Sequence, residues 1–191
     1  MTSKKQNGFT LVEALIAVAV FAIFSLLVNS IFFNILRGTA KQEALREVKQ
    51  NGDFAMTLMA NNIRYATGIY NNQNEGVLAT NCTEVDGTSL KVLNADGTTT
   101  KYELTGSSGK QKIQMTTSGS SEFITGSQVE LQDAGDLYFE CIQYDPSFIT
   151  RTITITFLLE HINNNIYTGT TKRPENQAVM YFQTTVYMRG N

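Results

Sequence analysis

The stretch Phe9-Thr10-Leu11-Val12-Glu13-Ala14-Leu15-Ile16 decides how this chain is organised. Glu13 is the only charged residue between Lys5 and Arg37, and no proline interrupts residues 14–36. An apolar helix of about 20 residues is long enough to cross a bilayer. A carboxylate in hydrocarbon costs roughly 2.5–3.5 kcal/mol on insertion scales, so Glu13 is a candidate functional residue.

The residues upstream of Glu13 make the segment specific. Lys4-Lys5 forms a short basic leader, and Gln6-Asn7-Gly8 runs into Phe9. This order of basic leader, glycine, phenylalanine, three further residues and glutamate resembles the class III signal of type IV prepilins and pseudopilins. The resemblance implies that a prepilin peptidase cuts between Gly8 and Phe9 and methylates the new N-terminus at Phe9. It also implies an assembly salt bridge between Glu13 and the Phe9 amine of a neighbouring subunit.

Two simpler interpretations of this segment stay open. A secretory signal peptide has an apolar core of about 7–15 residues, followed by a small-residue cleavage site. The apolar run here is longer, carries Glu13 at its front and ends in no clear Ala-x-Ala pattern. A plain single-pass anchor explains the length but not Gly8, Phe9 and Glu13 together. Lys4-Lys5 favours a cytoplasmic N-terminus, although Arg37 on the far side reduces the charge asymmetry.

Composition limits what the rest of the chain can be. The sequence has 191 residues and a formal net charge of −2, which suits one modest domain plus an anchor. The chain has no excess of basic residues, so we do not expect direct nucleic-acid binding. Polar uncharged residues are abundant after residue 70, which favours an extracytoplasmic surface. We see no nucleophile–base set, phosphate-binding loop or metal-ligand cluster, and therefore expect no enzyme activity and no cofactor.

A few polar residues have a possible chemical interpretation and a simpler structural one. His161 is the only histidine, and it follows a strand-like run, so we interpret it as a strand-end residue rather than a base. Asp133, Asp136 and Asp145 carry the oxygen ligands that calcium prefers. Their spacing fits no calcium loop, and we interpret them as turn residues.

Cys82 and Cys141 are the two cysteines of the chain. In an oxidising extracytoplasmic compartment, an even number of cysteines favours pairing, so we expect a disulfide between them. Two unpaired, buried thiols are the alternative.

The helical pattern continues past the apolar segment. Apolar residues recur at spacings of three and four, which predicts one buried stripe: Ala44, Leu45, Val48, Ala55, Leu58, Met59, Ile63 and Ala66. Gly52 interrupts the stripe at a cost of about 1 kcal/mol relative to alanine, and indicates a bend or a close approach to a sheet. Gly68 is a suitable helix stop. We therefore expect one helix from near Phe9 to near Thr67.

From residue 76 onward the pattern is typical of strands. The hairpin signal Ala95-Asp96-Gly97 places a glycine where a positive φ is needed. Stretches 118–126 and 163–177 are polar and are expected to be loops. The expected strands are 89–94, 99–104, 112–117, 129–132, 137–144, 152–160 and 178–188.

These elements predict an α+β fold, a long helix packed on a mostly antiparallel sheet. This is also the lollipop fold that the pilin resemblance implies. We divide the chain into a leader peptide, a transmembrane or filament-core helix, an amphipathic soluble half of the helix and a β-sheet globular region: 1–8, 9–36, 37–70 and 71–191.

Later segments bear on the subtype. Residues 59–68, Met-Ala-Asn-Asn-Ile-Arg-Tyr-Ala-Thr-Gly, and the terminal stretch 182–189 resemble minor pilins and minor pseudopilins of the PilW-like or J-type group. The chain also lacks the proline that many major pilins carry in the membrane segment, and it is larger than many of them. Both departures favour a minor subunit.

The resemblance also implies partners and a location. The partners are a prepilin peptidase, other pilin or pseudopilin subunits, an inner-membrane assembly platform with its ATPase, and the membrane itself. The protein would cross the inner membrane once and then enter a pilus or pseudopilus. A different class of function is a binding module at a filament tip or on the membrane, whose polar loops contact a surface, DNA or a secreted substrate.

Overall fold

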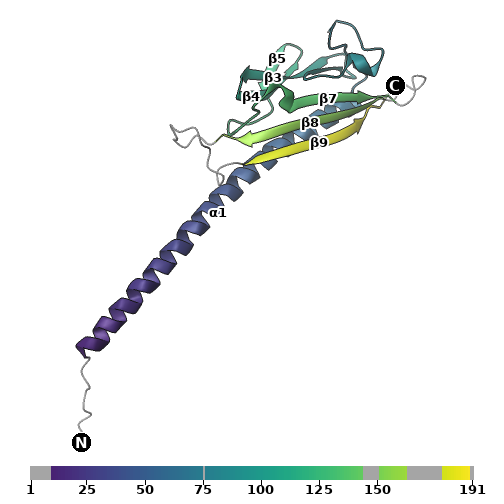
Figure 1. Ribbon diagram of the computed structural model, residues 1–191. Helices are drawn as coiled ribbons and strands as arrows, with labels where there is room; N and C mark the ends of the chain where they lie inside the picture. Colours follow the sequence, from purple (N-terminus) through teal and green to yellow (C-terminus); the bar gives the residue numbers. More distant parts are fainter. Residues whose placement is uncertain (1–9, 75, 144–150, 163–177, 190–191) are drawn as a thin grey trace, which may run out of the picture. The chain divides into compact units, whose positions relative to one another are not determined.

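The computed structural model describes residues 10–74, 76–143, 151–162 and 178–189 (Figure 1). The expected cleavage site, the Asp145 turn and the loop 163–177 lie outside these residues. The chain divides into two units, Met1–Ala40 and Lys41–Asn191. Helix α1 (Leu11–Tyr65) contributes residues to both units.

In the first unit, α1 is a helix without buried side chains. Every side chain described between residues 11 and 40 is exposed, and most of them are aliphatic or phenylalanine. The backbone hydrogen bonds of the helix are internal, but its apolar side chains have no partner within the unit. Such a surface requires an apolar surrounding that this unit does not supply.

In the second unit, α1 buries one face. The predicted stripe is confirmed: Val48, Ala55, Met59 and Ile63 have no exposed surface. The helix ends at Tyr65, slightly before the expected end near Thr67. Gly68, which we expected to stop the helix, instead begins the short strand β1 (Gly68–Ile69).

The first sheet has five antiparallel strands in the order β1-β2-β3-β4-β5. Strands β2 (Leu90–Leu93) and β3 (Thr99–Ser107) form the predicted hairpin. Gly97 has the expected positive φ, 82°, and Asn94 N donates to Thr98 O at 2.8 Å. Strand β4 (Lys110–Thr117) follows, as the sequence predicts.

The interpretation of residues 118–126 as a loop is wrong in part. Strand β5 (Ser120–Phe123) pairs with β4 inside this stretch. Ser118 and Gly119 both have positive φ, 50° and 87°, and form a tight turn that brings the chain back alongside β4. All four side chains of β5 are exposed, so the strand has no apolar alternation by which a sequence could reveal it.

The second sheet is built around β8 (Thr152–His161). Strands β7 (Leu137–Ile142) and β6 (Val129–Glu130) pair with opposite ends of β8 along one of its edges. Strand β9 (Val179–Tyr187) pairs with the other edge (Figure 1). Two short 3₁₀ helices, η1 (Cys82–Glu84) and η2 (Ala134–Asp136), lie in the connections.

The strands form two sheets rather than the one that we expected. A single bridge between Gln111 and Leu131 connects β4 with the segment after β6. The expected strand 129–132 is broken because β6 pairs with β8 over two residues only, after which the chain turns toward β4. The α+β fold with a helix on antiparallel strands is confirmed.

The core of the second unit lies between α1 and the sheets. The rings of Phe157 and Phe182 stack with centroids 5.1 Å apart. A Cβ atom added at Gly52 would lie 2.0 Å from the ring of Phe182, so of the two alternatives expected for this glycine, a bend or a close approach to the sheet, the structure shows the close approach. Asn62 Nδ2 donates to the Tyr102 hydroxyl at 2.6 Å. Burial raises the pKa of Tyr102 to about 12, although the bond from Asn62 opposes that shift.

Candidate functional site

The described part of the signal segment begins at Thr10, immediately before α1. The backbone N–H of Glu13 donates to Thr10 Oγ1 at 3.3 Å, and that of Ala14 donates to Thr10 O at 3.2 Å. Thr10 is therefore positioned as the N-cap of α1, and it satisfies N–H groups that a helix start leaves unpaired. Gly8 and Phe9 lie outside the described residues, so the cleavage and methylation positions remain predictions.

Glu13 lies in the first turn of α1. Its side chain is exposed, so the carboxylate is accessible to a group from another molecule. Negative charge near a helix N-terminus is also favourable, because the peptide dipoles leave partial positive charge there. The arrangement gives Glu13 a local role in helix initiation and leaves its carboxylate accessible. The assembly salt bridge with Phe9 of a neighbour stays a prediction.

Helix α1 contains an 18-residue window that is apolar enough to cross a membrane, and none of that window is buried. The two serines of this apolar segment have local partners. Ser25 Oγ donates to Phe21 O and Ser30 Oγ donates to Leu27 O, both at 2.8 Å. Hydroxyls that bond to the preceding turn are compatible with an apolar surrounding, because they are already satisfied within the helix.

The two cysteines are far from this segment in sequence. Cys82 in η1 and Cys141 in β7 are joined by a disulfide with Cα atoms 5.0 Å apart. Asp86 Oδ1 accepts a hydrogen bond from Cys141 N at 2.7 Å. The disulfide therefore fastens the connection between β1 and β2 to the second sheet.

A carboxylate stabilises the same connection. Glu84 accepts hydrogen bonds from Thr80 N at 2.9 Å, Thr80 Oγ1 at 3.0 Å and Asn81 Nδ2 at 3.0 Å. These bonds, with that from the Thr80 backbone foremost, hold the pKa of Glu84 below its usual value. Among the described residues, the hydrogen-bond partners of the Glu84 carboxylate include Thr80 and Asn81 of the same loop, and neither is a general base.

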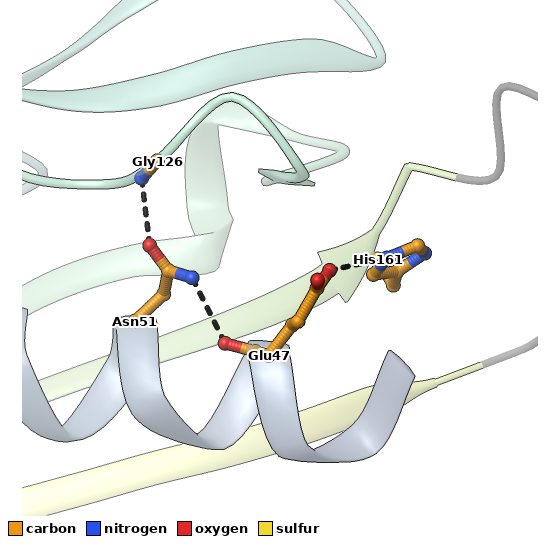
Figure 2. Close-up of polar contacts among 4 residues, drawn as sticks. All are labelled: Glu47, Asn51, Gly126 and His161. Atoms are coloured by element: carbon orange, nitrogen blue, oxygen red, sulfur yellow. Dashed lines mark hydrogen bonds and ion pairs between the residues drawn. The ribbon is translucent and has the colours of Figure 1, made fainter. Parts of the chain in front are cut away.

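His161 is the last residue of β8, as the sequence predicts, but it has a partner that the sequence did not reveal. Its Nε2 lies 2.9 Å from Glu47 Oε2 on α1. One turn further along the helix, Asn51 Nδ2 donates to Glu47 O, and Asn51 Oδ1 accepts from Gly126 N at 2.8 Å (Figure 2). These side chains tie α1 to the strands, and none of them forms a nucleophile–base pair.

The aspartates of the second sheet are turn residues. Asp136 Oδ2 accepts from Gln132 N at 2.8 Å and from Asp133 N at 2.9 Å. Asp133 and Asp136 form a reciprocal capping box on η2. Among the described residues, no three His, Cys, Asp or Glu side chains are grouped so that they could hold a metal ion.

Comparison with known proteins identifies the N-terminal segment. Residues 3–29 match the family model described as the prokaryotic N-terminal methylation motif. No curated protein and no solved structure matches the chain. The matched segment contains Gly8, Phe9 and Glu13, the residues on which the sequence prediction rests.

The motif has direct consequences for the class of protein. It implies processing by a prepilin peptidase, anchoring in a membrane through the apolar helix, and assembly with other pilin subunits. Chains with this motif are structural subunits that are generally not enzymes. The helix packed on antiparallel strands agrees with the fold of such subunits. The motif and the fold together support a type IV pilin-like protein.

Proposed function

We propose that this protein is a minor pilin or pseudopilin, which a prepilin peptidase processes and which then enters, or primes, a type IV pilus-like filament. The methylation motif over residues 3–29 is the observation that carries the proposal. On this view residues 1–8 are the leader, 9–36 the transmembrane or filament-core helix, 37–70 the soluble helical half, and 71–191 the globular region. The N-terminus faces the cytoplasm before processing.

In this proposal, Glu13 forms an ion pair that stabilises the apolar helix when it is packed in a filament. In a packed bundle of apolar helices, water is excluded and charge pairs are stronger than in solvent. The exposed carboxylate of Glu13 neutralises the Phe9 amine of a neighbouring subunit there. Removing one partner of a buried ion pair typically costs about 3–5 kcal/mol, because the other charge stays unpaired. A single polar residue in an apolar bundle also fixes register, as in coiled coils.

Processing is tested by N-terminal sequencing and intact mass of the membrane-extracted protein, with and without a co-expressed prepilin peptidase. We expect a mature chain that begins at methylated Phe9 only when the peptidase is present. A full-length chain under both conditions would favour a plain anchor. A cut beyond the apolar run would favour a conventional secreted protein.

Assembly is tested by Glu13→Ala in the full chain. We expect normal membrane insertion and cleavage, because the substitution removes a charge from an apolar segment and leaves Gly8 and Phe9 in place. Recovery of the variant in sheared filaments should fall at least about tenfold, since a loss of 1.4 kcal/mol already corresponds to that factor.

The matched control for the assembly test is Glu140→Ala. It removes an exposed carboxylate from β7 and leaves the apolar helix unchanged. Recovery of this control in filaments should be normal. Normal recovery of Glu13→Ala alongside it would refute the assembly role of Glu13 while leaving the processing result intact.

A further inference from the structure

Strand β9 has one free edge. Within the part of the chain that the structure describes, β9 pairs with β8 alone, through an unbroken register from Thr152–Tyr187 to Glu160–Val179. An edge strand leaves backbone N–H and C=O groups unpaired, and these groups form a template for a further strand. The character of this edge therefore decides whether another chain can pair with it.

Two hydrogen bonds show which backbone groups of β9 face away from β8. At one end of the ladder His161 N donates to Ala178 O at 2.9 Å. At the other end Met188 N donates to Arg151 O at 2.9 Å. In an antiparallel ladder, hydrogen-bonded pairs alternate with pairs whose backbone groups point outward. The residues with outward backbone groups are therefore Val179, Tyr181, Gln183, Thr185 and Tyr187.

Within the described residues, this edge shows none of the features that usually protect a sheet edge. Natural edge strands are short, carry charge or proline, contain bulges, or are covered by another segment. Strand β9 reads Val-Met-Tyr-Phe-Gln-Thr-Thr-Val-Tyr, with no charge and no proline, and its continuous register with β8 leaves no room for a bulge. It is therefore a long, uncharged and regular edge.

The outer edges of β5 and β7 differ from that of β9. Strand β5 is short and carries Glu122. The outer edge of β7 is bridged by Gly87, whose N and O both bond to Phe139, at 3.0 and 2.8 Å. Cys141 N on the same strand donates to Asp86 Oδ1. The contrast makes β9 the edge most suited to accept a partner strand.

The side chains beside the free edge also suit an interface. Tyr181 and Tyr187 are 58% and 65% exposed, and Val179 is 45% exposed. These three residues are also among those whose backbone N–H and C=O groups point outward. One partner strand could therefore pair with the backbone groups and contact the side chains. Interface cores are enriched in tyrosine and depleted of charge, and this surface has that composition.

We propose that the free edge of β9 binds an extended, uncharged segment of a neighbouring pilin-like subunit, which joins the second sheet as an added strand. Main-chain hydrogen bonds to the outward groups of β9 supply the attachment, and alternate side chains of the segment pack on Tyr181 and Tyr187. This mode of peptide binding is strand addition at a sheet edge. The proposal rests on the proposed function, because its partner is a subunit of the same filament.

Residue-resolved amide hydrogen exchange tests the proposal on the full chain, first in detergent and then in sheared filaments. We expect the amides of Tyr181, Gln183 and Thr185 to exchange quickly in detergent and at least about tenfold more slowly in filaments. Amides of Phe182 and Thr184, which face β8, should exchange slowly in both. Outward amides that exchange equally fast in both samples would overturn the strand addition while leaving filament entry intact. Absence of the protein from filaments would overturn both proposals.

A pair of lysine substitutions adds a functional measurement. Gln183→Lys places a charge on the free edge without removing a bond to β8, and Thr57→Lys places the same charge on an exposed position of α1. Both variants should keep the melting temperature of the unmodified chain. We expect the edge variant to lose several-fold in filament recovery and to regain fast exchange at Tyr181. Equal recovery of the two variants, with Tyr181 still protected, would contradict the proposed role of this edge.

Discussion

The two halves of α1 share one backbone conformation and differ in almost everything else. Between residues 11 and 36 the helix carries one charge, and all of its side chains are exposed. Between residues 41 and 65, charged residues cover one side, and Val48, Ala55, Met59 and Ile63 on the other are fully buried. Secondary structure alone therefore does not distinguish a helix that packs within its own chain from one that needs an external apolar surrounding.

The difference lies in where the burial energy comes from. Burying apolar surface contributes about 25 cal/mol per Å². The second half of α1 obtains this energy from its own sheets. The first half obtains none within its unit, so its apolar side chains can gain it only from lipid or from other helices. The stability of the sheet region should therefore change when its internal contacts are altered. The stability of the first half of α1 should instead depend on the lipid, detergent or helices around it.

Loss of the disulfide should cause the largest change in the stability of the sheet region. Reduction of the Cys82–Cys141 bond, or Cys82→Ala with Cys141→Ala, should lower the free energy of unfolding of the sheet region by about 2–4 kcal/mol. The bond closes a long loop, with a sequence separation of 59, which restricts the unfolded chain. Urea unfolding of the full chain in detergent, followed by tyrosine circular dichroism, measures the change.

The first half of α1 is the internal reference for this measurement. It contains no cysteine, so its helical signal in detergent should be the same before and after reduction. An equal loss of helix and sheet signals would show that the two halves of α1 unfold together, which is contrary to the comparison. Unchanged sheet stability after reduction would show that the disulfide contributes little.

Two glycines of the same helix give the second test. Gly38 has open space where a Cβ atom would lie, whereas a Cβ at Gly52 would lie 2.0 Å from the ring of Phe182. Gly38→Ala should favour the helix by up to about 1 kcal/mol, because alanine restricts the unfolded backbone. Gly52→Ala should instead destabilise by about 1–3 kcal/mol, because the buried ring must move. The same unfolding measurement compares both.

A compensating substitution checks the cause. In the Gly52→Ala background, Phe182→Leu removes the ring that a Cβ would meet, so part of the loss at Gly52 should be recovered. No recovery in the double variant would indicate that the loss at Gly52 does not come from Phe182. Equal effects of alanine at Gly38 and Gly52 would show that the packing of α1 does not differ between the first unit, which contains Gly38, and the second unit, which contains Gly52.

The sequence predicted the helix well, because periodicity of three and four is strong over a long segment. It also predicted the Gly52 approach and the hairpin at Gly97, since glycine there has a direct steric reason. Strand β5 was missed because its side chains are all exposed. The separation into two sheets depends on which strands pair, and local pattern does not contain that information.

The methylation motif could be recognised from the sequence for a different reason. Gly8, Phe9 and Glu13 lie close together in sequence, so one short pattern contains all three. The contact of Glu47 with His161 joins residues 114 positions apart, and no periodicity links them. Long-range polar contacts of this kind depend on how helix and sheet are placed, which only the folded structure reveals.

The smallest expected effect concerns this contact, which joins α1 to the sheet. The side chains of His161 and Glu47 are 16% and 39% exposed, so solvent weakens the interaction and a coupling of at most about 1 kcal/mol is expected. A double-mutant cycle of Glu47→Gln and His161→Gln isolates that coupling. The Lys49–Asp53 pair is the matched comparison, because its 3.1 Å contact lies within α1 and is more exposed. If the helix is held to the sheet partly by polar contacts, the Glu47 cycle should give the larger coupling. A larger value for Lys49–Asp53 would instead leave apolar burial as the force that holds this half of α1 in place.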